Sequence, residues 1–315
     1  MKQIKIISKI RKSIRIKENI RIPLSVPVRV KEDYIQNYLQ ATSNSGRLFL
    51  FAGDQKIEHL NKDFYGKGIS KEDENPEHLF KIASCARIGA FATQLGLISK
   101  YADDYRNVNY IVKLNSKTDL LSKKNIDPIS LSLNSVEDVV KFQRHSGLSI
   151  VGVGYTIYLG SQYEAEMLSQ AAQIVFNAHQ YGLITVLWMY PRGKEIKDEK
   201  SFDLIAGAAG VGVCLGTDFV KINPPNSKTS IEGAKKLKHV TMAAGRTKVI
   251  CSGGKLKDEN KFLMELSDQI NIGGAAGCAV GRNVHQKDLD SAIKFCNNIA
   301  AIVIDGLKFK EINKI

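Results

Sequence analysis

The chain has 315 residues, of which 43% are hydrophobic and 24% charged, which suits one large globular domain or two small ones. No uncharged apolar run approaches the roughly 20 residues of a membrane-spanning helix, which argues against an integral membrane protein. The five cysteines form no CxxC pair and the six histidines no HxH or HExxH pattern, so neither a disulfide framework nor a compact zinc site is indicated. We therefore expect reduced thiols and a cytoplasmic protein.

The formal charge of +13 is concentrated at the N-terminus. The first thirty residues hold nine lysines and arginines and one acid, Glu18, and so contribute +8 of the total. Such a segment could bind nucleic acid or an anionic membrane, or act as a transit peptide. We favour an amphipathic extension: Ile7, Ile10 and Ile14 are spaced for one helix face, aromatic residues are not interleaved, and no apolar targeting segment follows.

From residue 47 onward, strand-like and helix-like segments alternate without a break in composition. Strands are predicted over 47–54, 90–95, 110–115, 149–158, 183–190, 219–223, 248–252 and 277–281. Helices are predicted over 76–87, 163–181, 202–215, 230–244, 258–270 and 289–304. A helix or turn is expected through Tyr105, and another helix from Ser135, where Ser135 and Asp138 form an N-cap signal.

The predicted strands are continuous apolar runs, as expected for parallel strands that helices cover. The eight strand–helix units therefore predict a (β/α)8 TIM barrel. The predicted organisation is a basic extension over residues 1–46 and one barrel domain over residues 47–315. A doubly wound sheet is the alternative. Its usual glycine-rich first turn is poorly matched, since Gly152-Val153-Gly154 lacks a third glycine and lies mid-chain.

Barrel enzymes place their active sites at the carboxyl ends of the strands, and several predicted strands end in polar residues. The period-two alternation of a strand puts the members of four groups on a common face. These groups are Lys221 with Asn223, Trp188 with Tyr190, Lys113 with Asn115, and Asp54 with Ala52 and Leu50. Each also has a structural explanation, such as core packing for Trp188, a turn cap for Asp54, or an ion pair between Asp54 and Lys113.

The last two predicted strands continue into Ser252-Gly253-Gly254 and Gly281-Arg282. Barrels often bind phosphate after strands seven and eight, where glycines free backbone N–H groups to face the anion. The structural alternative is that the glycines only form tight turns after the strands. This explains one glycine-rich strand end easily and two such ends less easily. This pair therefore predicts a phosphate site.

The lysine of the apolar run Phe219-Val220-Lys221-Ile222-Asn223 is either solvated on an edge strand or buried. Burial lowers the pKa of a lysine toward the range in which its amine is a nucleophile. A buried Lys221, together with Tyr190, Asp54 and a phosphate site, predicts imine chemistry on a phosphorylated carbonyl compound. Lys221 attacks the carbonyl, Tyr190 moves protons, and Asp54 takes a hydroxyl proton as the C3–C4 bond of a ketose breaks.

Seven motifs follow one another from residue 48 to the last predicted helix. They are Asp54-Gln55-Lys56-Ile57-Glu58-His59, Lys113-Leu114-Asn115, Gly154-Tyr155-Thr156-Ile157-Tyr158-Leu159-Gly160-Ser161, Leu187-Trp188-Met189-Tyr190-Pro191-Arg192-Gly193, Phe219-Val220-Lys221-Ile222, Ser252-Gly253-Gly254 and Gly277-Cys278-Ala279-Val280-Gly281-Arg282-Asn283-Val284. This ordered set resembles the archaeal-type class I fructose-1,6-bisphosphate aldolases, within the wider deoxyribose-phosphate and tagatose-bisphosphate aldolase group.

The resemblance implies a homo-oligomer that acts on a sugar phosphate without metal or other cofactor. It implies Lys221 as the Schiff-base lysine, Tyr190 as the acid/base and Asp54 as the group that handles the C4 hydroxyl. The phosphate ligands that it implies are Ser252, Gly253, Gly254, Gly281 and Arg282. The further candidates for substrate binding are Trp188, Arg192, Lys113, Lys56 and His59.

The sequence departs from the family pattern beside two of these residues. Asp54-Gln55-Lys56 stands where Asp-His-Gly is usual, and Asn223 replaces a second lysine. Pro224-Pro225-Asn226 then follows instead of Tyr-Thr-Gly. These changes leave the nucleophile and the first phosphate site intact and alter the wall that reads the rest of the substrate. Lys56 is a candidate replacement for the lost lysine.

The predicted function is cleavage of fructose 1,6-bisphosphate to dihydroxyacetone phosphate and glyceraldehyde 3-phosphate, and the reverse condensation, in glycolysis and gluconeogenesis. The alternative is a related lysine-dependent aldolase or transaldolase for another sugar phosphate. A non-catalytic barrel that binds nucleic acid through the basic extension ranks below both, because it leaves Asp54, Tyr190 and Lys221 without a joint explanation.

Overall fold

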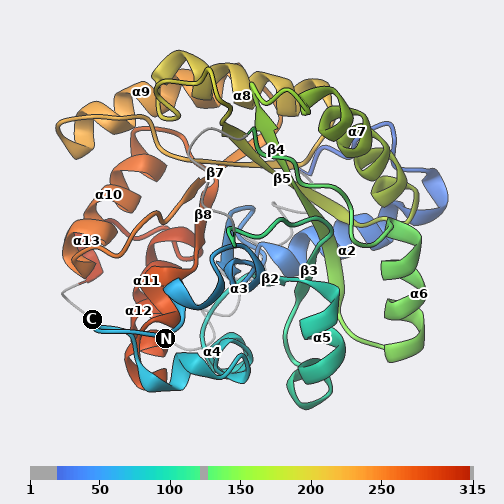
Figure 1. Ribbon diagram of the computed structural model, residues 1–315, viewed down its shortest axis with the longest axis horizontal. Coiled ribbons are helices and arrows are strands. Elements are labelled where there is room, and N and C mark those ends of the chain that lie inside the picture. Colours follow the sequence, from blue (N-terminus) through green and yellow to red (C-terminus); the bar gives the residue numbers. More distant parts are fainter. Residues whose placement is uncertain (1–19, 121–126, 313–315) are drawn as a thin grey trace, which may run out of the picture.

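The computed structural model describes residues 20–120 and 127–312, and its eight strands form one closed parallel barrel (Figure 1). The strands follow one another around the barrel in chain order, and β8 pairs with β1 to close it. Their bounds are β1 Leu48–Ala52, β2 Ala90–Thr93, β3 Tyr110–Lys113, β4 Ile150–Leu159, β5 Ile184–Pro191, β6 Phe219–Ile222, β7 Lys248–Ser252 and β8 Gly277–Val280. The (β/α)8 prediction is confirmed, and the doubly wound alternative is wrong.

Helices surround the barrel and follow its strands in the predicted order (Figure 1). They are α4 Glu77–Cys85, α5 Leu95–Tyr101, α6 Val136–Ser146, α7 Glu164–Gln180, α8 Phe202–Cys214, α9 Ser230–Ala243, α10 Glu259–Asn271 and α12 Leu289–Val303. The expected cap of α6 is present: the Ser135 hydroxyl accepts from the Asp138 N–H, and the Asp138 carboxylate accepts from the Ser135 N–H.

Several helices lie outside the sequence prediction. These are α2 Lys31–Ala41, α3 Gln55–Glu58, α11 Arg282–His285 and α13 Phe309–Ile312, with 3-10 turns η1 Val28–Val30, η2 Leu60–Asp63 and η3 Lys71–Glu74. Most are single turns, too short to show a helical period. The 3-10 turn η4 Ala102–Tyr105 continues α5 and agrees with the helix or turn expected through Tyr105. The isoleucines at positions 7, 10 and 14, which predict one helix face, lie outside the described residues.

The barrel interior follows the period-two alternation of its strands. The inward side chains form one apolar cluster, whose strand members are Leu48, Leu50, Ala90, Ala92, Ile111, Val151, Ile184, Val186, Trp188, Phe219, Ile250 and Ala279. Two residues further along three of the same faces come Lys113, Tyr190 and Lys221. The apolar interior therefore gives way to polar side chains at the carboxyl end of the barrel.

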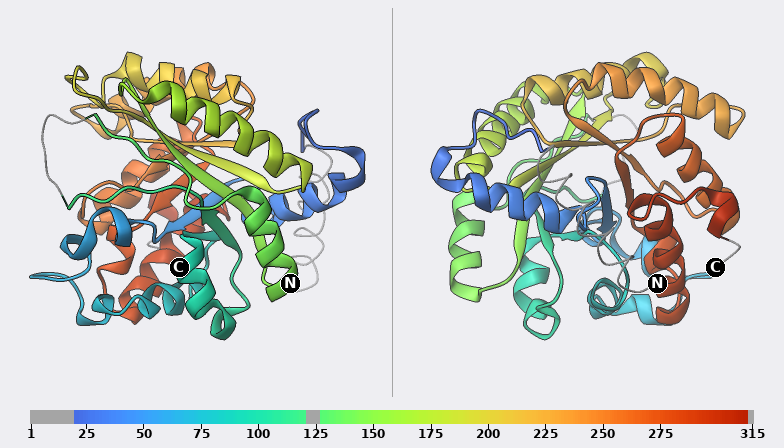
Figure 2. Two further views of the ribbon diagram at one scale, coloured as in Figure 1. Left: turned by 45° about the vertical axis from the view of Figure 1, so that its right-hand side comes forward. Right: turned by 180° about the vertical axis from the view of Figure 1, so that it is seen from behind.

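The segment before the barrel closes its opposite end. Tyr34 and Tyr38 on α2 belong to the interior cluster, and the Tyr38 ring stacks on Phe219 with 5.8 Å between centroids. Figure 2, in its view from behind, shows α2 lying across the barrel. The Tyr34 hydroxyl donates to Asp218 Oδ1 over 2.5 Å, and Asp218 Oδ2 accepts from the N–H and hydroxyl of Thr185. This buried network fastens α2 to the start of β6.

All five cysteines are free thiols, two of them exposed and three buried. Burial raises the pKa of the Cys251 thiol to about 12, and that of Cys278 also lies well above its usual range because of burial. Both thiols are therefore protonated and unreactive at neutral pH. Between residues 20 and 312, apart from the gap at 121–126, no helix is long and apolar enough to cross a membrane.

Candidate active site

Strand β6 places Lys221 inside the carboxyl end of the barrel, where the residue is 5% exposed. Burial lowers the pKa of Lys221; the Asp54 carboxylate opposes this change, and the Lys113 ammonium group adds to it. A lower pKa increases the fraction of neutral amine, which is the nucleophilic form. The solvated edge-strand alternative is wrong, because β6 is paired on both sides, with β5 and with β7.

The indole of Trp188 lies against two buried lysines. Its ring centroid is 5.0 Å from Lys221 Nζ and 5.3 Å from Lys113 Nζ. Lys221 is on the neighbouring strand β6, but Lys113 is on β3, two strands from Trp188 on β5. The indole can cross β4 because Gly154 has no side chain: a Cβ there would lie 2.2 Å from the ring. The weak dinucleotide-binding signal at this glycine thus reflects packing inside the barrel.

Lys113 is anchored by Asn115. Lys113 Nζ donates to the carbonyl oxygen of Asn115 over 2.9 Å and to the side-chain Oδ1 of Asn115 over 3.1 Å. Asn115 is itself fully buried, and its Oδ1 also accepts from the Thr156 N–H over 2.8 Å. Burial lowers the pKa of Lys113, while the Glu58 and Asp54 carboxylates oppose this change. Lys113 is therefore hydrogen-bonded to Asn115 rather than ion-paired with Asp54, and that alternative from the sequence is wrong.

Tyr190 lies near the end of β5, half-buried against the interior cluster. Burial raises the pKa of its phenol, and the carboxylates of Asp54 and Glu58 raise it further, so the hydroxyl is protonated at neutral pH. Arg192 stands 5.8 Å from the centroid of the Tyr190 ring, fixed by hydrogen bonds of 2.7 and 2.8 Å to Glu199. A protonated phenol in this position can donate a proton and take it back.

Asp54 directly follows β1 and is buried, with 5% exposure. It stands at the N-cap position of α3, yet its side chain makes no cap hydrogen bond, so the turn-cap explanation is wrong. Three buried polar atoms of the site have no hydrogen-bond partner within the described part of the chain: Asp54 Oδ1, Gln55 Oε1 and Trp188 Nε1. Buried polar atoms are normally paired, so these three are suited to bind a polar ligand.

The glycine-rich ends of β7 and β8 are adjacent, because Ser252 pairs with Ala279 in the strand register. Gly254 has a φ of +70°, which glycine adopts without strain. The Asn283 amide on α11 donates to the Gly253 carbonyl over 3.3 Å and so ties the two loops together. The Gly253 N–H already donates to the carbonyl oxygen of Ala279, so it is not free to bind an anion.

Asn223, one of the departures from the family pattern, contacts this predicted phosphate site. The Ser252 hydroxyl donates to Asn223 Oδ1 over 2.6 Å. Asn223 follows Lys221 by two residues, so it links the strand that carries the lysine to the last residue of β7. The amide nitrogen of Asn223 can donate to a ligand at the same time.

Asp63 gathers two predicted substrate-binding side chains. Its Oδ2 accepts from His59 Nδ1 over 2.5 Å and lies 3.5 Å from Arg282 Nε. Burial alone raises the pKa of Asp63, but the hydrogen bond from His59 and the charge of Arg282 lower it overall. Lys56 Nζ lies over the neighbouring Phe64 ring, 4.4 Å from its centroid, and burial lowers its pKa.

Sequence reasoning missed three side chains of this site: Gln55, Glu58 and Asp63. Gln55 and Glu58 belong to the motif that begins at Asp54, and the single turn of α3 puts residues three apart on one face. That spacing was the available signal for both. No local sequence signal pointed to Asp63, because its pairing with Arg282 joins the loop after β1 to the loop after β8, which are far apart in the sequence.

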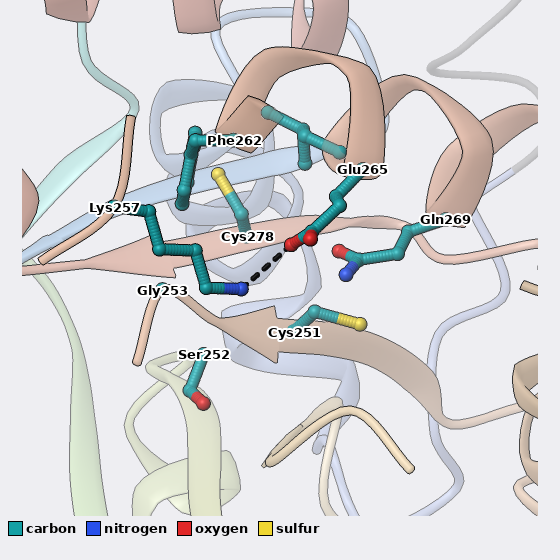
Figure 3. A pocket seen from close by; sticks show the side chains of 9 residues that line it. Cys251, Ser252, Gly253, Lys257, Phe262, Glu265, Gln269 and Cys278 are labelled. Atoms are coloured by element: carbon teal, nitrogen blue, oxygen red, sulfur yellow. Dashed lines mark hydrogen bonds and ion pairs between the residues drawn. The ribbon is translucent and has the colours of Figure 1, made fainter. Parts of the chain in front are cut away.

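A small cavity lies behind the predicted phosphate site, on the outer side of the barrel (Figure 3). It is lined by Cys251, Ser252, Gly253, Lys257, Phe262, Glu265, Leu266, Gln269 and Cys278. Lys257 and Glu265 form an ion pair of 2.6 Å beside it. Cys251 and Cys278 belong to the core between strands and helices, so this cavity is separate from the barrel interior.

The site thus combines a buried amine with a lowered pKa, a protonated phenol, a carboxylate and a glycine-rich end suited to an anion. Together these groups can form and break an imine with a phosphorylated carbonyl compound. Among residues 20–120 and 127–312, no three histidine, cysteine or acidic side chains are grouped to hold a metal ion.

Comparison with known proteins extends these observations. Residues 48–287 match the family model described as "DeoC/LacD family aldolase". The protein named "Fructose-bisphosphate aldolase/6-deoxy-5-ketofructose 1-phosphate synthase" of Methanocaldococcus jannaschii is 55% identical over 299 residues, which cover 95% of each chain.

Two solved structures are similar over most of their length. A fructose-bisphosphate aldolase from Slackia heliotrinireducens superposes with a TM-score of 0.91 at 50% identity, covering 94% of this chain and 93% of that one. An archaeal fructose-1,6-bisphosphate aldolase, with its catalytic lysine covalently bound to the carbinolamine intermediate of the substrate, has a TM-score of 0.72 at 33% identity. That match covers 85% of this chain and 98% of the other.

Proposed function

The chain belongs to the DeoC/LacD aldolase family, and from this premise we propose that it is a class I fructose-1,6-bisphosphate aldolase. It cleaves the ketose bisphosphate to dihydroxyacetone phosphate and glyceraldehyde 3-phosphate and catalyses the reverse condensation, in glycolysis and gluconeogenesis. The observation that carries the proposal is the burial of Lys221 inside the barrel, with a lowered pKa. A relative at 33% identity uses a catalytic lysine that forms a carbinolamine with its substrate.

In this mechanism, the Lys221 amine attacks the C2 carbonyl, and the resulting carbinolamine loses water to give an iminium ion. Asp54 takes the proton of the C4 hydroxyl as the C3–C4 bond breaks and the aldehyde leaves. The bonding electrons move to the iminium nitrogen and give an enamine. Tyr190 protonates the departing hydroxyl, and its raised pKa fits a group that starts as an acid. The proton that Asp54 took from the C4 hydroxyl then returns to the Tyr190 phenolate, which passes it to the enamine carbon. Hydrolysis of the imine then releases dihydroxyacetone phosphate and restores Lys221.

The anion-binding end of the barrel holds the C1 phosphate in this proposal. The residues proposed to surround that phosphate are Ser252, Gly253, Gly254, Gly281 and Arg282. Because the Gly253 N–H donates to Ala279, Gly253 contributes the close approach of its backbone rather than a hydrogen bond. The other substrate-binding candidates are Trp188 and Lys113 beside the imine, and Arg192 and Lys56 toward the far phosphate. The remaining candidate, His59, shares Asp63 with Arg282 and so belongs to the C1 phosphate end.

A second candidate function is a condensation that gives a sugar with one phosphate. The Methanocaldococcus jannaschii relative also bears the name 6-deoxy-5-ketofructose 1-phosphate synthase, and that product has its phosphate at C1. Bond cleavage between C3 and C4 of this product would give dihydroxyacetone phosphate and an unphosphorylated 2-oxo aldehyde. The departure at Lys56 lies among the residues proposed to read the second phosphate, and it favours this candidate as an additional reaction. Asn223 instead contacts Ser252 at the proposed C1 phosphate site.

A coupled assay of fructose 1,6-bisphosphate cleavage tests the main proposal. We expect Lys221→Met to lower kcat by at least about a thousandfold, because the nucleophile is removed while a side chain of similar length fills the space. The exposed lysine at position 100 provides the matched control, and Lys100→Met should keep full activity. EDTA should have no effect on the wild type. Wild-type protein that leaves the bisphosphate intact, or Lys221→Met with normal activity, would contradict the proposal.

A panel of aldehydes separates the two candidate functions. The wild type is incubated with dihydroxyacetone phosphate and either glyceraldehyde 3-phosphate or an unphosphorylated 2-oxo aldehyde. Turnover of the second pair at a rate similar to the first would establish the additional reaction, and its absence would eliminate it.

The cellular setting is part of the same proposal. Five free thiols fit a reducing compartment, and we assign the enzyme to the cytoplasm. We also propose a homo-oligomer, with exposed apolar side chains such as Phe176 on α7 and Met242 on α9 as candidate contacts.

A further inference from the structure

Gln55 stands between two parts of the active site. It is the first residue of α3, directly after Asp54. Its side-chain amide lies over Gly281, since a Cβ on that glycine would be 2.5 Å from Gln55 Nε2 and 2.9 Å from its Oε1. Strands β1 and β8 are neighbours in the barrel, so the amide lies beside the loop that carries Arg282.

This close approach explains the glycine at position 281. The φ of Gly281 is −117°, so this glycine does not serve a left-handed turn. A side chain there would instead collide with the amide of Gln55 and with the carbonyl oxygen of Ala52 at 2.7 Å. The end of β8 is therefore shaped to leave room for the Gln55 amide.

The oxygen of this amide also lacks a hydrogen-bond partner within the described residues. Gln55 Oε1 is buried and unpaired with respect to the described residues, as is Oδ1 of the adjacent Asp54. Two neighbouring acceptors without donors are costly in a folded protein, unless a ligand supplies the donors. A polyhydroxylated substrate in the barrel mouth carries such hydroxyl groups.

We propose that Gln55 binds substrate and recognises the triose-phosphate half of the ketose, which carries the imine carbon. The inference rests on the proposed aldolase function. A carboxamide has one acceptor oxygen and two donor hydrogens, so it can accept from the C3 hydroxyl and donate to an oxygen of the C1 phosphate group. Its place over Gly281 and next to Arg282, rather than beside Arg192, assigns it to this half of the substrate.

The test measures binding of the triose phosphate separately from binding of the aldehyde. Borohydride reduction traps the imine on Lys221, and the concentration of dihydroxyacetone phosphate that gives half-maximal trapping is determined for each variant. We expect Gln55→Met to raise this concentration about tenfold to a hundredfold, as for loss of one or two hydrogen bonds to a charged or polar ligand. The KM for glyceraldehyde 3-phosphate should remain within about threefold of the wild-type value.

Gln55→Glu distinguishes substrate contact from a structural role. It keeps the shape and one acceptor but adds a negative charge beside the phosphate. We expect a larger loss of trapping with dihydroxyacetone phosphate than with unphosphorylated dihydroxyacetone. The matched control is Gln36→Met, at an exposed position on α2, which should leave both values unchanged.

The outcomes separate this inference from the function on which it rests. Wild-type protein that is not trapped by dihydroxyacetone phosphate contradicts the proposed function itself. If the wild type is trapped and Gln55→Met has the same half-maximal concentration, Gln55 does not bind the triose-phosphate half. If Gln55→Glu loses trapping equally with dihydroxyacetone phosphate and with dihydroxyacetone, the assignment of Gln55 to the phosphate end of the substrate is overturned.

Discussion

Two lysines are buried in this barrel, and their hydrogen bonds distinguish their roles. Lys113 Nζ donates to two oxygens of Asn115, which hold it in place. Within the described residues, Lys221 Nζ has no hydrogen bond and lies against the Trp188 ring. An amine that is buried, unpaired and near a second ammonium group is the better nucleophile, because its neutral form costs less. This comparison supports Lys221 as the reacting residue and Lys113 as its neighbour.

Asp63 supplies a second test at the scale of single residues. Asp63→Asn keeps the shape but removes the charge that holds His59 and Arg282 together. We expect the KM for fructose 1,6-bisphosphate to rise about tenfold with kcat changed less than about threefold, because the residue positions binding groups and does not touch the reacting atoms. Asp103→Asn is the control, since Asp103 also pairs with an arginine, Arg106, but on the surface. An unchanged KM would contradict a positioning role.

The same variant has a pH signature. The pKa of Asp63 is lower in the folded protein than the value near 4 of an unfolded chain. Its charge therefore contributes stability above about pH 4, and that contribution is lost as the pH falls through the folded value. The stability difference between wild type and Asp63→Asn should be largest near neutral pH and shrink in acid. A difference that stays constant from pH 7 to pH 3 would contradict this account.

At the scale of elements, α2 and the barrel are separate contributors, one to stability and the other to catalysis. Helix α2 closes the amino end of the barrel, and the site occupies the carboxyl end. The helix was missed in the sequence because it follows the basic segment and precedes the first strand, where no strand–helix alternation marks it. Its buried tyrosines, Tyr34 and Tyr38, are four residues apart and so lie on one face.

Tyr34→Phe tests this separation. The change removes the donor to Asp218 and leaves a buried carboxylate oxygen with one partner fewer. We expect a loss of about 1–3 kcal/mol in the free energy of unfolding, measured with urea, and no change in kcat. Tyr38→Phe is the control, because the Tyr38 hydroxyl makes only a 3.4 Å contact with Gly46 O, and it should cost clearly less. Equal losses, or a lower kcat in Tyr34→Phe, would contradict the separation.

At the scale of the whole molecule, the alternation of apolar runs was enough to predict a barrel with neighbours in chain order. It was also enough to bring Lys113, Tyr190 and Lys221 to one end, because the period of a strand decides which side chains point inward. Contacts that depend on the closed shape could not be predicted. Trp188 reaches Lys113 across Gly154, and such a contact follows from strand spacing and side-chain direction rather than from any local pattern.

The central claim is that an imine forms on Lys221 during the reaction. The protein is reduced with borohydride in the presence of fructose 1,6-bisphosphate, digested, and its peptides are mapped by mass spectrometry. We predict loss of activity together with a reduced substrate adduct on the peptide that contains Lys221. An adduct on Lys113, or on Lys117 beside the Tyr158 ring, or no adduct on any lysine of a protein shown to be active, would contradict the claim.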